Sequence, residues 1–396
     1  MALHPTRRAS GMEYAIRDLV VYARELEKKG VDVIRMNIGD PVAYGFDTPE
    51  HIKRALFDAV LEGKNGYCDS EGDPELREAV AERERRKNGS SASASDVIIT
   101  SGITEGIQLL TGALIEQGDE MLLPGPTYPL YSSLTRFFGG TPVFYRTIEE
   151  ESWKPDIEDL RKKVSGKTRA IVVVNPSNPT GAIYGKRELG EIAAIAGENR
   201  IPLIVDEIYD MLVFDGEHLS PVSLAPDIPV ITLNGFSKAY LVTGWRAGYM
   251  VFRDNDNAMA ELKEAVLKEV RARLSANFPV QRAMVAALRG PQDHIGRMVS
   301  KLRRRRDLIV KRLNEMPYIS TTKPAGAFYV FPSIEKGHFK NDMEFVLHIL
   351  MKGHVLFVHG SGFGSEYGEM HFRSVFLPDE EFIEKAMNGL ELALRE

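Results

Sequence analysis

Two stretches decide the fold of this chain: PLIVDEIY at residues 202–209 and VITLNGFSK at residues 230–238. Each begins as a short apolar run rich in β-branched residues and ends in polar or glycine-containing sequence. Continuous apolar runs of this length are typical of strands in a sheet that is covered on both faces. Both stretches are therefore predicted to contain buried strands.

The same pattern recurs between about residue 97 and residue 252. Further strands are expected at Val97–Thr100, Glu120–Leu123, Ala170–Val174 and Gly248–Phe252. Helical patterns follow most of them, as at Ile107–Ile115. Strands that alternate with helices predict an α/β fold whose sheet is mainly parallel, with right-handed crossovers.

The rest of the chain predicts a second, smaller α+β domain. A charged helical pattern at 254–276 is expected to connect the domains, and strand-like runs follow at 326–331 and 355–358. Length alone allows two domains. We predict an N-terminal segment at 1–45 that packs with the small domain, a large α/β domain at 46–278 and a small domain at 279–396.

Composition excludes several classes of function. The 396 residues carry a net charge of −6, which gives no electrostatic reason to expect nucleic acid. No apolar run is long enough to span a membrane, and the N-terminus does not resemble a secretory signal. The single cysteine, Cys68, indicates a reducing cytoplasm, and the nine histidines show no zinc spacing, so no metal is expected.

Unusual residues gather where the predicted strands end. Four strand ends supply SGIT (101–104), NPSNPTG (175–181), DEIY (206–209) and NGFSK (234–238), and Tyr128 follows another strand. Ligands of open α/β sheets bind beyond the carboxyl ends of the strands. These motifs are therefore expected to converge on one crevice.

The strand-end residues match the needs of a pyridoxal cofactor. Lys238 supplies an amine for an imine with its aldehyde, and Asp206 supplies an anion for its pyridine nitrogen. Glu207 is expected to point away from Asp206, because neighbours on a strand face opposite sides. Taken alone, each residue is more often structural, as a surface lysine or a helix cap, and only their combination favours a cofactor site.

The phosphate and the ring of such a cofactor also find candidate partners. Gly102, Ile103 and Thr104 open a helix, whose free N–H groups and dipole favour a phosphate. Arg246 can add charge-assisted hydrogen bonds to that phosphate. Tyr128 can stack on the ring, and Tyr209 can bond its hydroxyl.

The whole pattern resembles the class I/II aminotransferases of pyridoxal-phosphate fold type I. The resemblance runs from NIGDP (37–41) to HFRSVFL (371–377), and its most specific parts are NPSNPTG, DEIY and SKAYLVTGWRAG (237–248). It implies pyridoxal 5′-phosphate, with Lys238 as the Schiff-base lysine and proton carrier. It also implies that Asp206 pairs with the pyridine nitrogen, that Tyr209 and Asn178 bond the ring oxygen, and that Tyr128 stacks.

For the substrate, the resemblance implies that Arg373 clamps the α-carboxylate by bidentate hydrogen bonds, with Asn178 and the backbone of Gly39 beside it. Tyr67 matches a tyrosine that the family lends to the neighbouring subunit's cofactor phosphate, which implies a homodimer. One position departs from the family: many members have a serine where this chain has Gly235, and Ser237 is the candidate substitute.

The segments YAIRD (14–18), NIGDP, DSEGDPELR (69–77) and LFVHGSGFG (356–364) are most similar to prokaryotic alanine aminotransferases. This implies a ping-pong exchange of amino groups between alanine and 2-oxoglutarate. Two alternatives stay open: a C–S lyase or other α,β-eliminating enzyme on the same fold, and a non-catalytic pyridoxal-phosphate sensor. The absence of room for a DNA-binding head before residue 40 disfavours the sensor.

Overall fold

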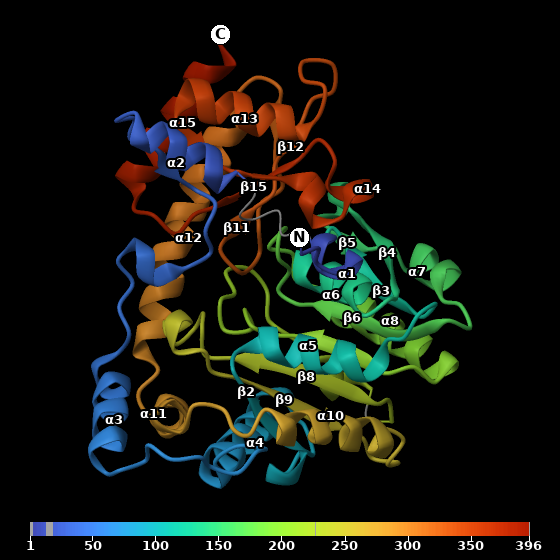
Figure 1. The fold of residues 1–396 in the computed structure, drawn as a ribbon. Helices are drawn as coiled ribbons and strands as arrows, with labels where there is room; N and C mark the ends of the chain where they lie inside the picture. The colour runs from blue at the N-terminus through green and yellow to red at the C-terminus, as the bar shows by residue number, and fades with distance from the viewer. Residues whose placement is uncertain (1–2, 13–18, 226, 396) are drawn as a thin grey trace.

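The computed structural model describes residues 3–12, 19–225 and 227–395. The YAIRD segment at 14–18, part of the resemblance to alanine aminotransferases, lies outside the described residues. The described chain forms a large lower part built around one sheet and a smaller upper part (Figure 1).

The large part is organised by an eight-stranded sheet with the strand order β2-β9-β8-β7-β6-β3-β4-β5. Its strands are β2 (Val97–Thr100), β3 (Glu120–Gly125), β4 (Thr141–Ile148), β5 (Lys154–Pro155), β6 (Thr168–Val174), β7 (Leu203–Asp206), β8 (Val230–Gly235) and β9 (Gly248–Arg253). The five strands from β8 to β4 pair in parallel, whereas β9 pairs antiparallel with both β8 and β2, and β5 pairs antiparallel with β4. The prediction of a mainly parallel sheet is confirmed.

Helices cover both faces of this sheet. One face packs against α5 (Ile103–Leu114), α6 (Pro129–Phe137) and α10 (Ala260–Ala272). The other face packs against α4 (Pro74–Asn88), α7 (Ile157–Lys163), α8 (Lys186–Asn199), α9 (Pro221–Leu224) and α11 (Phe278–Arg289), and α3 (Glu50–Leu61) packs against α11. In β7 the side chains alternate, because Ile204 contacts the first layer while Leu203 and Val205 contact the second.

The small part has its own apolar core. It contains α12 (Asp293–Asn314), β10 (Ile319–Ser320), β11 (Tyr329–Val330), β12 (Ser333–Ile334), α13 (Asp342–Gly353), β13 (Val355–Leu356), β14 (Val358–His359), α14 (Ser365–Gly368), β15 (Phe372–Val375) and α15 (Glu380–Leu394). Near the N-terminus, α2 (Val20–Lys28) packs into this core, and β1 (Ile34–Arg35) pairs in parallel with β13. Short helical segments complete the described chain: α1 (Arg7–Ser10), η2 (Pro41–Tyr44), η3 (Ala94–Asp96), η4 (Glu149–Glu151), η5 (Thr243–Trp245) and η6 (Gly360–Phe363).

The connection between the two parts differs from the prediction. The charged helix expected at 254–276 is α10, and it lies on the sheet because Val266 and Val270 bury their side chains there. The long helix α12 instead rises from the level of α11 to α15 (Figure 1). The domain limits 1–45, 46–278 and 279–396 remain our proposal.

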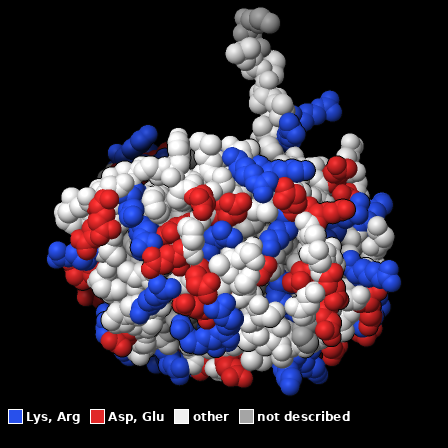
Figure 2. Space-filling model, turned by 90° about the horizontal axis from the view of Figure 1, so that it is seen from below, with Lys and Arg blue, Asp and Glu red and all other residues white. Residues whose placement is uncertain are grey.

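The surface carries charges of both signs. Acidic and basic side chains are interspersed over the face in Figure 2, so this face presents no extended field of one sign. No helix among the described residues is both long and apolar enough to cross a membrane.

Candidate active site

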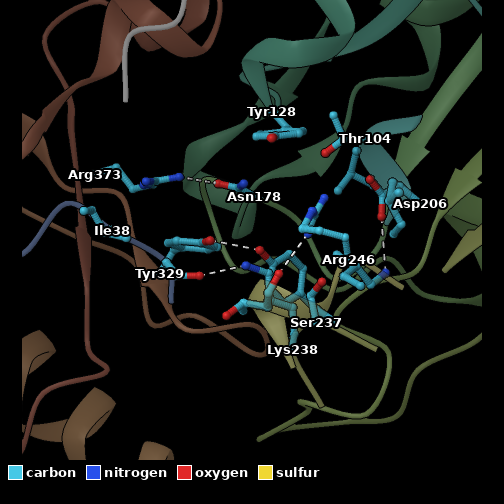
Figure 3. Close-up of a pocket in the computed structure, with 16 residues that line it drawn as sticks. Ile38, Thr104, Tyr128, Asn178, Asp206, Ser237, Lys238, Arg246, Tyr329 and Arg373 are labelled. Carbon is cyan, nitrogen blue, oxygen red and sulfur yellow. Dashed lines mark hydrogen bonds between the residues drawn. The ribbon is translucent and has the colours of Figure 1, made fainter. Parts of the chain in front are cut away.

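A cavity of about 340 Å³ lies between the carboxyl ends of the central strands and the small part of the molecule (Figure 3). Its walls contain eleven of the residues predicted from the sequence: Gly39, Ile103, Thr104, Tyr128, Asn178, Asp206, Tyr209, Ser237, Lys238, Arg246 and Arg373. The expectation that separate strand-end motifs meet in one crevice therefore holds in the structure.

Lys238 places an amine in this cavity. It follows β8 by three residues, and its Nζ donates a hydrogen bond to the backbone oxygen of Gly39 over 2.7 Å. The amine is partly accessible at the cavity wall, but protein surrounds it, and this burial lowers the pKa of Lys238 to about 8. The Asp40 charge opposes that shift and the Arg373 charge adds to it. A lowered pKa increases the fraction of neutral, nucleophilic amine near neutral pH.

Asp206 places a buried carboxyl at the same cavity. It is the last residue of β7, and it accepts hydrogen bonds from the Tyr131 hydroxyl at 3.1 Å and the Ile208 amide at 3.2 Å. Burial raises the pKa of Asp206 to about 6, although both hydrogen bonds and the nearby Lys238 charge favour the ionised form. A cationic ring nitrogen beside this carboxyl would favour the ionised form further.

The N-terminus of α5 and Arg246 lie close together at the cavity wall. Gly102 caps α5 with a φ of +78°, and the first N–H groups of a helix have no partner within it. A Cβ at Gly102 would lie 2.4 Å from Nη2 of Arg246, so only glycine allows this approach. Arg246 donates to the backbone oxygens of Thr243 and Ser101 at 3.0 and 3.4 Å. Free helical N–H groups and a guanidinium together suit an anion such as a phosphate.

Arg373 forms the opposite wall of the cavity. It comes from β15, is 1% exposed, and donates to Oδ1 of Asn178 at 3.0 Å and to the backbone oxygen of Asn37 at 2.8 Å. Its guanidinium lies 4.4 Å from the ring centre of Tyr329 and 4.8 Å from that of Phe363. The two rings and two hydrogen bonds fix the plane of the guanidinium, while its Nε has no hydrogen-bond partner among the described residues.

Two predicted residues do not line the cavity. Gly102 is the N-cap of α5, and the next two residues of that helix, Ile103 and Thr104, line the cavity instead. Tyr67 is 81% exposed in the single chain and lies outside the cavity altogether. The role that the resemblance implies for Tyr67 requires a second subunit, and it stays a prediction.

Several cavity residues were not predicted from the sequence. They are Ile38, Val174, Ile208, Thr243 and Tyr329. Thr243 lies inside the quoted SKAYLVTGWRAG motif, and its hydroxyl donates to Oδ1 of Asp40 at 2.9 Å. The hydroxyl of Tyr329 lies 2.9 Å from that of Tyr209, and this contact joins the small part to the DEIY motif. The sequence feature that could have identified Tyr329 is its place as an aromatic residue in a predicted strand of the small domain.

The position of Gly235 is explained by packing. A Cβ on Gly235 would lie 3.0 Å from the backbone oxygen of Ala247 and 3.1 Å from Cα of Gly248. The side chain of a serine would therefore crowd β9 unless the strands moved slightly apart. Ser237 lines the cavity instead, so a hydroxyl is available two residues later. Among the described residues, no cluster of three or more His, Cys, Asp or Glu side chains is arranged to hold a metal ion.

Comparison with known proteins agrees with this geometry. Residues 31–390 match the family model of aminotransferase class I and II. The chain is 39% identical to the glutamate-pyruvate aminotransferase of Haemophilus influenzae, over 93% of this chain and 92% of that protein. The solved structure of an alanine aminotransferase from Pyrococcus furiosus is 57% identical and superposes with a TM-score of 0.97, covering 99% of this chain and 100% of that one.

An aspartate aminotransferase from Thermus thermophilus, solved with maleate, is also similar. It is 33% identical, with a TM-score of 0.90 over 99% of this chain and 100% of that one. This chain is therefore similar to aminotransferases that are named for different amino acids, alanine and aspartate. The chain belongs to the aminotransferase class I and II family, and it is an aminotransferase that uses pyridoxal 5′-phosphate.

Proposed function

We propose that this enzyme exchanges an amino group between alanine and 2-oxoglutarate, a reaction that also runs from glutamate and pyruvate. The observation that carries the proposal is the arrangement of Lys238 and Arg373 in one cavity. Lys238 supplies an amine for the cofactor aldehyde, and Arg373 supplies a fixed guanidinium for the carboxylate of the substrate. The names of the similar enzymes from Pyrococcus furiosus and Haemophilus influenzae support alanine and glutamate as substrates.

The residues present fit pyridoxal 5′-phosphate. When bound, this cofactor supplies an aldehyde that bonds to amines and a protonated ring that withdraws electrons. The buried carboxyl of Asp206 suits the ring nitrogen, and the α5 N-terminus with Arg246 suits the phosphate. The hydroxyl of Ser237 is a further candidate for the phosphate.

Lys238 would hold the cofactor aldehyde through its Nζ, and the same Nζ, once a substrate amine has taken its place, would accept and return a proton. The lowered pKa of the amine suits both tasks, because a group that titrates near the working pH can accept and return a proton. Tyr128 is proposed to stack on the cofactor ring. Tyr209 and Asn178, which also line the cavity, are proposed to bond its ring oxygen.

Arg373 is proposed to bind the α-carboxylate that amino acids and oxo acids share. Asn178 and the Tyr329 ring hold the guanidinium in place before the substrate arrives, which reduces the entropy lost on binding. Gly39 must lack a side chain here, because a Cβ would lie 2.1 Å from the Tyr329 hydroxyl. Its backbone is thereby able to come close to the substrate.

The number of positive charges in the cavity wall suits an amino acid with an uncharged side chain. The cationic side chains that line the cavity in the described structure are Lys238, Arg246 and Arg373. With those three assigned to the aldehyde, the phosphate and the α-carboxylate, no further lining cation is left for a side-chain carboxylate. Alanine needs none, because its side chain is a methyl group, whereas the second carboxylate of glutamate or 2-oxoglutarate would have to be bound by uncharged groups of the cavity or by a second subunit.

We further propose that the enzyme works as a cytoplasmic homodimer. Tyr67 is exposed, and apolar side chains of the nearby helix α3 are exposed as well, with Phe57 57% and Leu61 69% accessible. A second copy related by a two-fold axis would bury such surface and bring Tyr67 to its neighbour's phosphate site.

A substrate panel tests the proposed reaction. Alanine, glutamate, aspartate, phenylalanine and cysteine would each be offered to the loaded enzyme while the cofactor absorbance is followed. Alanine and glutamate should convert the cofactor to its amino form, and pyruvate and 2-oxoglutarate should reverse the change. A clear preference for aspartate or phenylalanine would refute the substrate assignment. Release of ammonia and pyruvate from cysteine, with the aldehyde form retained, would favour the lyase alternative.

A further inference from the structure

The segment DEIYD at residues 206–210 has two faces with different surroundings. Asp206 and Tyr209 line the cavity. Glu207 and Asp210 are equally buried, at 0% and 4% exposure, but they do not line it. Both of these carboxyls accept hydrogen bonds from side chains of helix α4. This helix lies below the sheet in Figure 1. One short segment therefore carries two proposed cofactor residues on one side and two buried acids on the other.

Asp210 is held by two cations of α4. Its Oδ2 accepts hydrogen bonds from Arg83 and, over 2.8 Å, from Nζ of Lys87. The same Lys87 amine donates to the backbone oxygen of Asp210 over 3.0 Å. Burial works against ionisation, but the Arg83 and Lys87 charges prevail and hold the pKa of Asp210 well below its usual range. Asp210 is therefore a charged anchor for the backbone directly after Tyr209.

Glu207 is held by an amide that it shares with another acid. Nδ2 of Asn88 donates to Oε2 of Glu207 at 3.0 Å and to Oε2 of Glu84 at 2.6 Å. Glu84 is paired further with Arg83 at 2.6 Å and with the Tyr249 hydroxyl at 3.0 Å. Glu84 thus has a cation and two further donors as partners, whereas no cation of the described residues lies at hydrogen-bonding distance from Glu207.

The charges of this cluster balance when Glu207 is neutral. The two positive charges of Arg83 and Lys87 then equal the two negative charges of Glu84 and Asp210. Burial, together with the charges of Glu84 and Asp210, raises the pKa of Glu207 and favours its protonated form. His218, whose Nε2 lies 3.7 Å from Oε1 of Glu207, has its pKa lowered to about 4 by burial and so adds no charge at neutral pH.

We propose that Glu207 and Asp210 are positioning residues, which fix the DEIYD segment to α4 and thereby hold Asp206 and Tyr209 in place for the cofactor. The backbone bonds from Glu207 N to Leu233 O at 2.8 Å and from Asn175 N to Asp206 O at 3.0 Å secure the end of β7. Beyond that point the side-chain bonds to α4 fix the turn. The inference rests on the proposed roles of Asp206 and Tyr209.

The consequence of losing these anchors follows from geometry. A displacement of about 1 Å in a catalytic group can cost on the order of 100-fold in rate. Removing an outer partner of a functional group typically costs about 10–100-fold in affinity or activity. Loss of the anchors should therefore affect the cofactor first. Arg373 keeps its own hydrogen bonds to Asn178 and Asn37, so the site for the substrate carboxylate should change less.

Four variants test the proposal in the full-length enzyme: Glu207→Ala, Glu207→Gln, Asp210→Asn and the control Glu188→Ala. Glu188 is also a buried acid, but it caps α8 and contacts none of these groups. The measurements are the affinity of cofactor-free protein for pyridoxal 5′-phosphate by absorbance titration, the unfolding temperature without cofactor, and kcat and KM separately. Absence of cofactor binding in the wild type would instead contradict the proposed function itself.

Glu207→Ala and Asp210→Asn should weaken cofactor binding by about tenfold or more and lower kcat, with KM near the wild-type value. Glu207→Gln, which keeps the shape of a neutral carboxyl, should restore most of the affinity. Glu188→Ala should lower the unfolding temperature only. If Glu207→Ala does not fold, Asn88→Ala provides the same comparison, because it removes the shared amide. Unchanged cofactor affinity in folded Glu207 and Asp210 variants would overturn the proposal. It would also be overturned if Glu207→Gln weakened cofactor binding as much as Glu207→Ala does.

Discussion

The hydroxyl of Tyr131 donates a hydrogen bond over 3.1 Å to Oδ2 of Asp206. Tyr131 belongs to α6 and Asp206 ends β7, so the bond joins a helix on one face of the sheet to the floor of the cavity. It is one of two hydrogen bonds that oppose the effect of burial on the pKa of Asp206. The ionised state that a cofactor ring nitrogen needs therefore depends partly on a residue outside the cavity lining.

Tyr131→Phe should weaken cofactor binding, and more so at low pH. Loss of a donor to a buried carboxylate costs about 1–3 kcal/mol. Because the hydroxyl lowers the pKa of Asp206, its removal should raise that pKa further, and the ionised form is then lost at a higher pH than in the wild type. Cofactor affinity measured against pH should fall earlier on acidification. Tyr145→Phe, which removes a buried hydroxyl bonded to Val172, is the matched control and should leave the pH profile unchanged.

Asp206→Asn should lose most of the transamination rate and bind the cofactor weakly. Breaking a buried ion pair by removing one partner costs on the order of 3–5 kcal/mol. Asp206→Glu keeps the charge and should retain part of the rate. The comparison requires single-turnover rates at saturating cofactor. Near-normal turnover by the Asn variant would contradict the electron-withdrawing role assigned to this pair.

Arg373→Lys should reduce the affinity for amino acids and oxo acids together. Lysine keeps the charge but lacks the planar fork that bonds both oxygens of a carboxylate. The spectrum of the bound cofactor should stay unchanged, since Arg373 lies on the opposite wall from Asp206 (Figure 3). Arg306→Lys serves as the control, because Arg306 is also buried but does not line the cavity. An effect on only one substrate class would show that the shared carboxylate is not the group that Arg373 binds.

The sequence was sufficient to predict the sheet and most of the cavity wall, because both follow from local patterns. Asp206 and Lys238 lie directly after apolar strands, and parallel strands bring their carboxyl ends to one edge. Tyr131 and Tyr329 could not be found this way. Each reaches the site from a separate helix or strand, and the packing that aims their hydroxyls is set by tertiary contacts between distant segments.

The position of the charged helix at 254–276 differs from the prediction for a related reason. Its charges predicted a connector between the domains, but α10 packs on the sheet through the buried Val266 and Val270 and the partly buried Leu262 and Leu267. Glu207 was expected to face away from Asp206, and it does. Its pairing with α4 depends on residues more than a hundred positions away, which no local pattern specifies.

Tyr67 should act in the neighbouring subunit. Lys238→Ala chains, which keep Tyr67, can be unfolded and reassembled with Tyr67→Ala chains, which keep Lys238. In a mixed dimer one site is then whole and the other carries both defects. With random exchange, about half of the dimers are mixed and about a quarter of all sites should regain normal cofactor affinity. Size measurement must first confirm that dimers reform. No regain in reformed dimers would show that Tyr67 serves its own chain.

The covalent attachment of the cofactor to Lys238 is the central claim, and borohydride reduction followed by peptide mass mapping tests it most directly. Lys238 is the lysine whose amine lines the cavity in the described structure, and its lowered pKa suits bond formation with an aldehyde. The account predicts a reduced pyridoxyl phosphate group on the peptide that contains Lys238, and no covalent label on Lys238→Ala protein that still binds the cofactor. A label on any other lysine of the wild-type enzyme would contradict it.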